Sequence, residues 1–119
     1  ATVGVSLPIY AAAPAAEVDA TARASAGADR PGTINIVAFL PARHTDAALL
    51  NALCTVTEAK VQALTDGGVP GTGTASDAVT VLCPAEGSAE PFGGPRSTYG
   101  APLARAVYAA VRTGIGSWG

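Results

Sequence analysis

The sequence predicts an α/β (or α+β) fold in which a mixed sheet contains a β-α-β crossover and carries two helices. Two observations predict it: short segments rich in β-branched residues flank a long segment with helical spacing, and a second helical segment closes the chain. The expected order is strand, strand, helix, strand, helix. At 119 residues the chain is too short for two independent cores, so we expect residues 1–119 to form a single domain or part of one.

The two earliest strands are separated by a segment with no clear periodicity. Residues 2–6 alternate β-branched with small residues and predict the first strand. Residues 11–31 are rich in Ala, Pro, Gly and Asp and indicate an irregular connection with room for one helical turn. Residues 33–40 form an apolar run, with Asn35 as its exception, that is typical of a strand covered on both faces.

A long helix is expected next. Thr45 or Asp46 can cap its beginning, and Gly67 and Gly68, with Pro70 just beyond, supply its end. This helix should connect the strand before it to the strand after it as a right-handed parallel crossover.

The remaining third of the chain predicts one more strand and one more helix. A strand at residues 77–83 ends at Pro84, and the Gly/Pro-rich residues 84–99 predict a loop. A helix is expected at about residues 100–112 because apolar residues recur there at the spacing of one buried stripe: Leu103, Ala106, Val107, Ala110 and Val111.

Composition excludes several classes of partner. A net charge of -2 with 13% charged residues leaves no electrostatic footprint for nucleic acid or an anionic membrane. No window approaches the roughly 18 apolar residues that would span a bilayer, and the start of the chain shows no signal peptide. We therefore expect a cytoplasmic protein that binds small molecules or other proteins.

The cysteines and the histidine carry no metal pattern. Cys54 and Cys83 are far apart in sequence, and we expect both to be buried thiols rather than a disulfide or a nucleophile. One histidine cannot build a zinc site, so no metal or cofactor is expected. His44 follows Arg43 at a loop and is expected to face solvent.

Lys60 is unusual because it lies in the apolar stripe of the long helix. At about 100° per residue from Leu49, Lys60 falls at about 20°, in the same stripe as Leu53, Val56, Ala63 and Leu64. An unpaired ammonium there would cost several kcal/mol to bury, so Lys60 must extend to solvent, pair with a carboxylate or lose its proton. A structural lysine and a functional lysine, acting as general base or cationic anchor, both remain open.

Topology brings polar residues toward Lys60. The helix of a parallel crossover runs antiparallel to its strands, so Lys60 should lie where both strands begin. Thr33 and Asn35 open one strand, and residues 71–77 lead into the other and end in Asp77. We expect a Lys60–Asp77 pair at this end of the sheet, beside several hydroxyls. The glycines of residues 71–76 do not form a nucleotide loop, because that segment opens a strand rather than a helix.

Other candidate residues have an ordinary structural interpretation as well as a functional one. Glu58 belongs to a polar stripe, expected to be solvated, that also contains Asn51, Thr55 and Gln62. Arg96, with Ser97 beside it, could contact an anionic group or simply face solvent.

Several segments in this order resemble the adenosylcobinamide amidohydrolase family. They are Gly32-Thr33-Ile34-Asn35, Thr57-Glu58-Ala59-Lys60, Thr72-Gly73-Thr74-Ala75-Ser76-Asp77 and Gly93-Gly94-Pro95-Arg96-Ser97-Thr98-Tyr99-Gly100. The resemblance implies hydrolysis of the amide that joins the aminopropanol arm to a corrin side chain, which gives adenosylcobyric acid in corrinoid salvage. It also implies that this chain is the C-terminal part of a larger amidohydrolase domain. His44 and Cys83 match no family feature.

The resemblance implies a corrinoid substrate, whose cobalt belongs to that substrate. The expected catalytic residues are Lys60, Asp77, Glu58 and Thr74, and the expected substrate-binding residues are Thr33, Asn35, Thr72, Gly73, Arg96 and Ser97. The alternatives are a non-catalytic corrinoid-binding or assembly module that needs a partner segment, and a structural oligomerisation domain. A homo-oligomer or association with a missing N-terminal portion is also expected.

Overall fold

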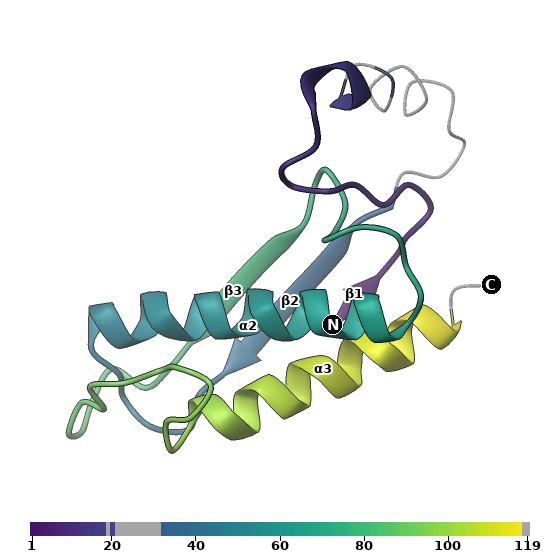
Figure 1. Ribbon diagram of the computed structural model, residues 1–119. Coiled ribbons are helices and arrows are strands. Elements are labelled where there is room, and N and C mark those ends of the chain that lie inside the picture. The colour runs from purple at the N-terminus through teal and green to yellow at the C-terminus, as the bar shows by residue number, and fades with distance from the viewer. Residues whose placement is uncertain (19, 21–31, 118–119) are drawn as a thin grey trace.

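A computed structural model describes residues 1–18, 20 and 32–117. Its elements are β1 (Thr2–Val3), β2 (Ile34–Phe39), α2 (Asp46–Asp66), β3 (Ala78–Leu82) and α3 (Gly100–Ser117) (Figure 1). The predicted order of strand, strand, helix, strand, helix is confirmed. Residues 15–18 are helical, as the expected connection at 11–31 allowed, whereas residues 19 and 21–31 of that connection lie outside the described residues.

The sheet is mixed, with the strand order β1-β2-β3. β1 pairs antiparallel with β2, so that Thr2 lies opposite Asn35 and Val3 opposite Ile34. β2 and β3 are parallel and are connected through α2, which confirms the predicted crossover. β1 is shorter than the predicted strand at residues 2–6. After Gly4 donates to the carbonyl of Thr33, the chain leaves β2, and Ile9 bridges instead to Gly73.

Among the residues that the structure describes, only one face of the sheet is covered. Ile34, Ile36 and Ala38 are at most 7% exposed, whereas the alternate residues Val37 and Phe39 are 69% and 67% exposed. The expectation that this strand is covered on both faces is therefore wrong. The reason is that α2 and α3 lie side by side against the same face (Figure 1).

α2 has the expected ends. The Thr45 side chain accepts a hydrogen bond from the backbone N–H of Ala48, and Gly67 caps the other end by donating to the carbonyl of Ala63. Its buried face includes the predicted Val56, Lys60, Ala63 and Leu64, but is turned toward a row of small residues: Ala48, Ala52, Thr55 and Ala59. Leu53, predicted to be in the stripe, is 39% exposed.

The buried face of α2 is rotated toward its small residues because three parts of the chain pack against the helix: the sheet, α3 and the loop before α3. Thr55, predicted to be solvated, is 1% exposed, and its hydroxyl donates to the carbonyl of Gly93 at 2.9 Å. A Cβ on Gly93 would collide with the backbone of Ala48 and Ala52. The glycine thus allows the loop to lie directly on the helix.

α3 extends beyond the predicted residue 112 to Ser117. Leu103, Val107 and Val111 of its predicted stripe are buried, but Ala106 is exposed and Ala110 is half-buried. Part of the apolar stripe of α3 therefore remains uncovered. In the described part of the chain, no helix has the length and apolar character needed to cross a membrane.

Both cysteines are free. Cys54 is exposed and Cys83 is half-buried, so the expectation of two buried thiols is wrong for Cys54 and only partly met by Cys83. Cys54 lies on the side of α2 away from the sheet, because the buried face of the helix is turned toward its small residues.

Candidate functional site

Lys60 and Asp77 form an ion pair at the end of the sheet where β2 and β3 begin. Lys60 Nζ lies 2.5 Å from Asp77 Oδ2, and the two side chains are only 9% and 12% exposed. Two charges this far from solvent are tolerated only when each satisfies the other. The predicted pairing of these residues is confirmed, and Lys60 is neither extended to solvent nor alone.

The other carboxylate oxygen of Asp77 is also occupied. The Thr74 hydroxyl donates to Oδ1 at 2.6 Å, and the backbone N–H of Ile34 donates to the same oxygen at 3.0 Å. Asp77 therefore joins α2, the first residue of β2 and the turn that precedes β3.

The pKa of Asp77 is lowered below its ordinary value. Burial acts to raise this pKa, but the hydrogen bonds from Lys60 and Thr74, together with the charge of Lys60, outweigh it. The carboxylate is thus ionised at neutral pH in the resting site.

Gly73 has a steric reason to be glycine. A Cβ at this position would collide with the Asp77 carboxylate and would lie 2.7 Å from Lys60 Nζ. The ion pair therefore lies directly against the backbone of Gly73. This residue shapes the site by having no side chain.

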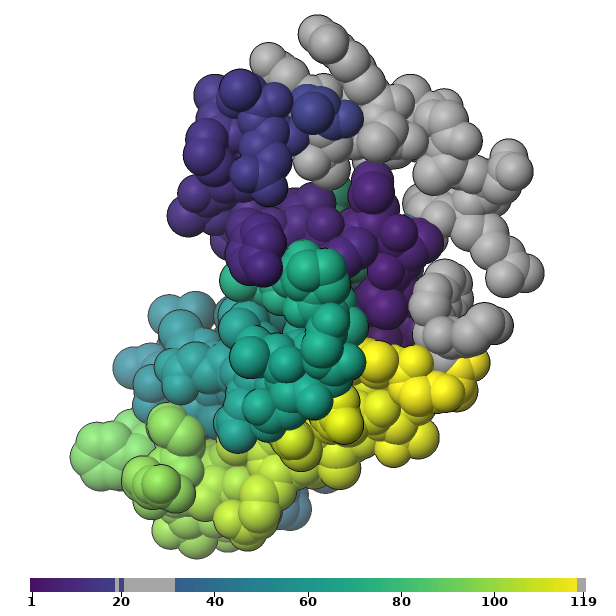
Figure 2. All heavy atoms as spheres, turned by 45° about the vertical axis from the view of Figure 1, so that its right-hand side comes forward, coloured from purple at the N-terminus to yellow at the C-terminus, as the bar shows by residue number. Residues whose placement is uncertain are grey.

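The segment around residues 9–11 closes over the turn that contains Gly73. Ile9 donates to the carbonyl of Gly73 at 2.9 Å, and Thr72 donates to the carbonyl of Ile9 at 2.8 Å. In Figure 2 this N-terminal segment lies directly against the residues that follow α2. The site is thus bounded by a segment distant from it in sequence.

Two of the predicted substrate-binding hydroxyls form backbone contacts. The Thr72 hydroxyl accepts a hydrogen bond from the N–H of Ala11 at 3.0 Å, and the Thr33 hydroxyl donates to the carbonyl of Ser76 at 3.0 Å. Both residues lie beside the ion pair. Their hydroxyls hold neighbouring segments together.

Asn35 and Glu58 lie away from the ion pair. Asn35 is exposed on the open face of the sheet, opposite to the face that α2 covers. Glu58 is on the exposed side of α2, where it lines a shallow hollow with Gln62 and Asp66. Topology placed Asn35 at the correct end of the sheet, but the alternation of a half-covered strand put its side chain on the far side.

Arg96 and Ser97 belong to the loop that leads into α3. Ser97 Oγ accepts a hydrogen bond from the N–H of Gly100 at 3.0 Å and donates to the carbonyl of Gly94 at 2.8 Å, so it caps the helix. Arg96 is exposed and lines a separate hollow with Arg105 and Tyr108. Neither residue takes part in the contacts around Asp77.

His44 is buried, in contrast to its expected exposure. It is 4% exposed and packs edge-on against Tyr99, with 5.5 Å between the ring centroids. Its Nδ1 lies 2.8 Å from the carbonyl of Ala42, so that nitrogen carries the proton. The loop before α3 covers it, since the Thr45 N–H donates to the carbonyl of Glu90 at 3.1 Å and the Glu90 N–H donates to the carbonyl of Arg43 at 2.8 Å.

Sequence reasoning also missed the backbone N–H of Ile34 as a member of the site. Every residue except proline has such a donor, so no residue type marks it. Only the expectation that β2 and β3 begin side by side could have indicated this donor.

Fold and site together define an α/β domain with a buried Lys–Asp–Thr cluster at the amino ends of two parallel strands. The chain belongs to the adenosylcobinamide amidohydrolase family, whose model matches residues 1–119. It is 40% identical over 88 residues to the adenosylcobinamide amidohydrolase of Halobacterium salinarum, covering 73% of this chain and 37% of that protein.

A second relative, the adenosylcobinamide amidohydrolase of Methanosarcina mazei, is 34% identical over 95 residues, covering 72% of this chain and 48% of that protein. The chain therefore spans less than half the length of these curated relatives. No solved structure matches it.

Proposed function

We propose that this chain carries the Lys60, Thr74 and Asp77 cluster of an enzyme that hydrolyses the aminopropanol amide of adenosylcobinamide. The products would be adenosylcobyric acid and the free amine of the aminopropanol arm, with one water consumed. Family membership over residues 1–119 supports the reaction, and the buried ion pair with its adjoining hydroxyl supports these residues as its site. The cobalt is part of the substrate.

In this proposal Lys60 stabilises negative charge on the carbonyl oxygen as the tetrahedral intermediate forms. A cation fixed before the reaction begins stabilises such charge more than a mobile one does, because no reorganisation is needed. The ion pair with Asp77 provides that fixation, and burial strengthens the electrostatic interaction.

Thr74 is the hydroxyl that either attacks the amide carbon or holds the attacking water. Its hydrogen bond to Asp77 Oδ1 orients the proton toward a carboxylate that can accept it. The departing amide nitrogen then takes that proton and leaves as the free amine, which returns Asp77 to its ionised form. Thr72 is less suited because its hydroxyl is engaged with the segment at residues 9–11. Glu58 is less suited because it lies on the exposed side of α2.

The test is formation of adenosylcobyric acid from adenosylcobinamide, followed by chromatography, with this chain and with a form extended to the length of its relatives. Lys60→Ala and Thr74→Ala should each abolish product formation, whereas Glu58→Gln on the exposed side of α2 should retain it. Thr74→Ser should retain activity, and intact-mass measurement on the reacting enzyme would reveal an acyl adduct if the hydroxyl is the nucleophile. Normal turnover in Lys60→Ala or Thr74→Ala would overturn the proposal.

A non-catalytic corrinoid-binding module is the second candidate. The observation that favours it is that the chain spans 37% and 48% of the two relatives, so the rest of an active site could lie in the part not matched. This candidate predicts a change in the corrinoid absorption spectrum on titration with the 119-residue chain, but product only with the extended form. Product from the 119-residue chain alone would exclude it.

A further inference from the structure

Within the described part of the chain, β2 has a free edge over most of its length. β1 contributes only Thr2 and Val3 to the pairing, opposite Asn35 and Ile34. Among the described residues, no strand pairs with this side of β2 beyond Asn35. A long unpaired edge is unusual, since proteins normally cover or pair such edges.

The register identifies the backbone groups that are unpaired. Ile34 and Leu40 direct their N–H groups toward Asp77 and Leu82, so even-numbered residues of β2 bond on the β3 side. Odd-numbered residues bond on the β1 side, as the hydrogen bond from Gly4 to the carbonyl of Thr33 confirms. Val37 and Phe39 therefore present their N–H and C=O groups at the free edge.

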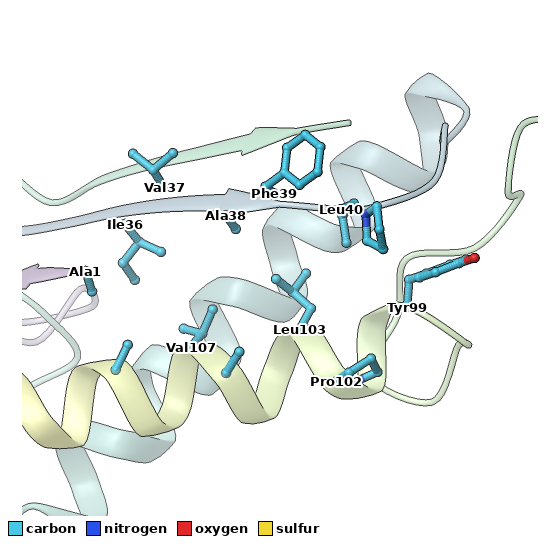
Figure 3. A pocket seen from close by; sticks show the side chains of 13 residues that line it. Ala1, Ile36, Val37, Ala38, Phe39, Leu40, Tyr99, Pro102, Leu103 and Val107 are labelled. Carbon is cyan, nitrogen blue, oxygen red and sulfur yellow. The ribbon is translucent and has the colours of Figure 1, made fainter. Parts of the chain in front are cut away.

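A groove of about 430 Å³ lies beside this edge, between β2 and α3 (Figure 3). Ile36 of β2 points into it from one side, and Leu103 and Val107 of α3 point into it from the other. Ala106 and Ala110, the incompletely covered part of the α3 stripe, also line it. The groove thus combines unpaired backbone groups with an apolar floor.

We propose that this groove binds an extended polypeptide segment that runs antiparallel to β2 and continues β1. Because Thr2 lies opposite Asn35 and the pairing is antiparallel, a residue ahead of Ala1 would reach Val37, and the chain before it would pass Phe39. Its backbone would pair with both residues. This mode of binding is the addition of a β-strand to a sheet edge.

The occupant is polypeptide that the longer members of the family carry outside the part matched here. The two curated relatives are matched over only 37% and 48% of their lengths, so each has enough chain to supply a strand. By the same register Ala1 already falls opposite Ile36 and lines the groove. The next side chain on this face, opposite Ala38, would face α3 and should be small and apolar, because no charged side chain lines the groove. The alternate side chains would extend the open face that carries Val37 and Phe39.

The experiment measures amide hydrogen exchange by NMR in the 119-residue chain and in a form with an N-terminal extension. The extension is the stretch of the Methanosarcina mazei relative that precedes its counterpart of β1, long enough to pass Leu40. Exchange at Val37 and Phe39 should slow by about tenfold or more in the extended form. The Ile36 and Ala38 amides, on the β3 side, report that both forms are folded.

Ala106→Arg places a bulky charge in the groove and should return Val37 and Phe39 to fast exchange in the extended form. Ala109→Arg is the matched control, since Ala109 is exposed on the same helix and does not line the groove. If the extended form does not fold, the same stretch added as a separate peptide gives the same measurement. Unchanged exchange at Val37 and Phe39 would overturn the proposal, as would concentration-dependent protection in the unextended chain, which would assign the groove to a second copy.

Discussion

Lys60→Met is the substitution that tests the buried ion pair most directly. Methionine is one heavy atom shorter than lysine and keeps an unbranched apolar stem, so the change removes the charge and little of the packing. It leaves the Asp77 carboxylate, at 12% exposure, with only Thr74 and the N–H of Ile34 as partners. Removing one member of a buried ion pair costs about 3–5 kcal/mol. Because the Lys60–Asp77 pair is slightly exposed, we expect Lys60→Met to lower the free energy of unfolding by about 3 kcal/mol.

The assay is urea unfolding followed by circular dichroism. With a slope of about 1.5 kcal/mol per M, the midpoint should fall by about 2 M. Adding Asp77→Asn removes the uncompensated charge and should recover about 1–2 kcal/mol. Arg105→Met, on an exposed position of α3, is the matched control and should change stability by less than about 0.5 kcal/mol.

The pH dependence of stability tests the same contact. The folded pKa of Asp77 lies below the ordinary value of 3.8, so the unfolded state binds more protons as pH falls, and stability rises with pH. The contribution of Asp77 is present above pH 3.8 and is lost as pH falls through its lower folded pKa. Lys60→Met removes the lysine's lowering effects while burial still raises the pKa, so the stability that Asp77 loses on acidification should shrink or change sign in this variant, and its free energy of unfolding should depend less steeply on pH in the acid range. An unchanged acid limb, or a double variant no more stable than Lys60→Met, would refute this reasoning.

Three further predictions concern packing and exposure. Gly73→Ala should destabilise the chain by about 1–3 kcal/mol because its Cβ would collide with the ion pair. Gly116→Ala is the control and should not destabilise the chain, because its Cβ meets nothing within 4 Å. Equal urea midpoints for the two variants would contradict the steric argument. Thr55→Val should lower the free energy of unfolding by about 1–2 kcal/mol, because the Gly93 carbonyl loses its donor. Thr57→Val, at an exposed position of the same helix, should have a stability close to that of the parent. Thermal unfolding of both variants would show whether this difference exists. Cys54 should react with a thiol reagent faster than Cys83, which peptide mapping after brief labelling can check; faster labelling of Cys83 would be inconsistent with their relative exposure.

Much of the fold was predictable because its signals are local. Thr45 and Gly67 mark the ends of α2 through capping preferences, and both positions are confirmed. The Lys60–Asp77 pair also followed from the sequence, because a parallel crossover fixes which end of the helix lies over the strand starts. Such arguments need only spacing and topology.

The parts that failed depend on which faces are covered. Ile34 to Phe39 reads as a strand buried on both faces, but both helices pack on one side and leave Val37 and Phe39 exposed. The same fact moves Asn35 to the side opposite Lys60. His44 looked solvent-facing because nothing local indicated that residues near Glu90 would fold over it. The catalytic and substrate-binding roles assigned to all ten candidate residues stay predictions.

One carboxylate group receives hydrogen bonds from residues 17 and 43 positions away along the chain, as well as from its own turn. Its surroundings therefore exist only when the helix, the central strand and the turn before the last strand have all assembled. Partial opening of any one of these three elements would separate the members of the cluster before the rest of the chain unfolded. Loss of activity at this position must consequently be compared with loss of folding, and an inhibitor that fits the cluster should also raise the temperature at which the domain melts.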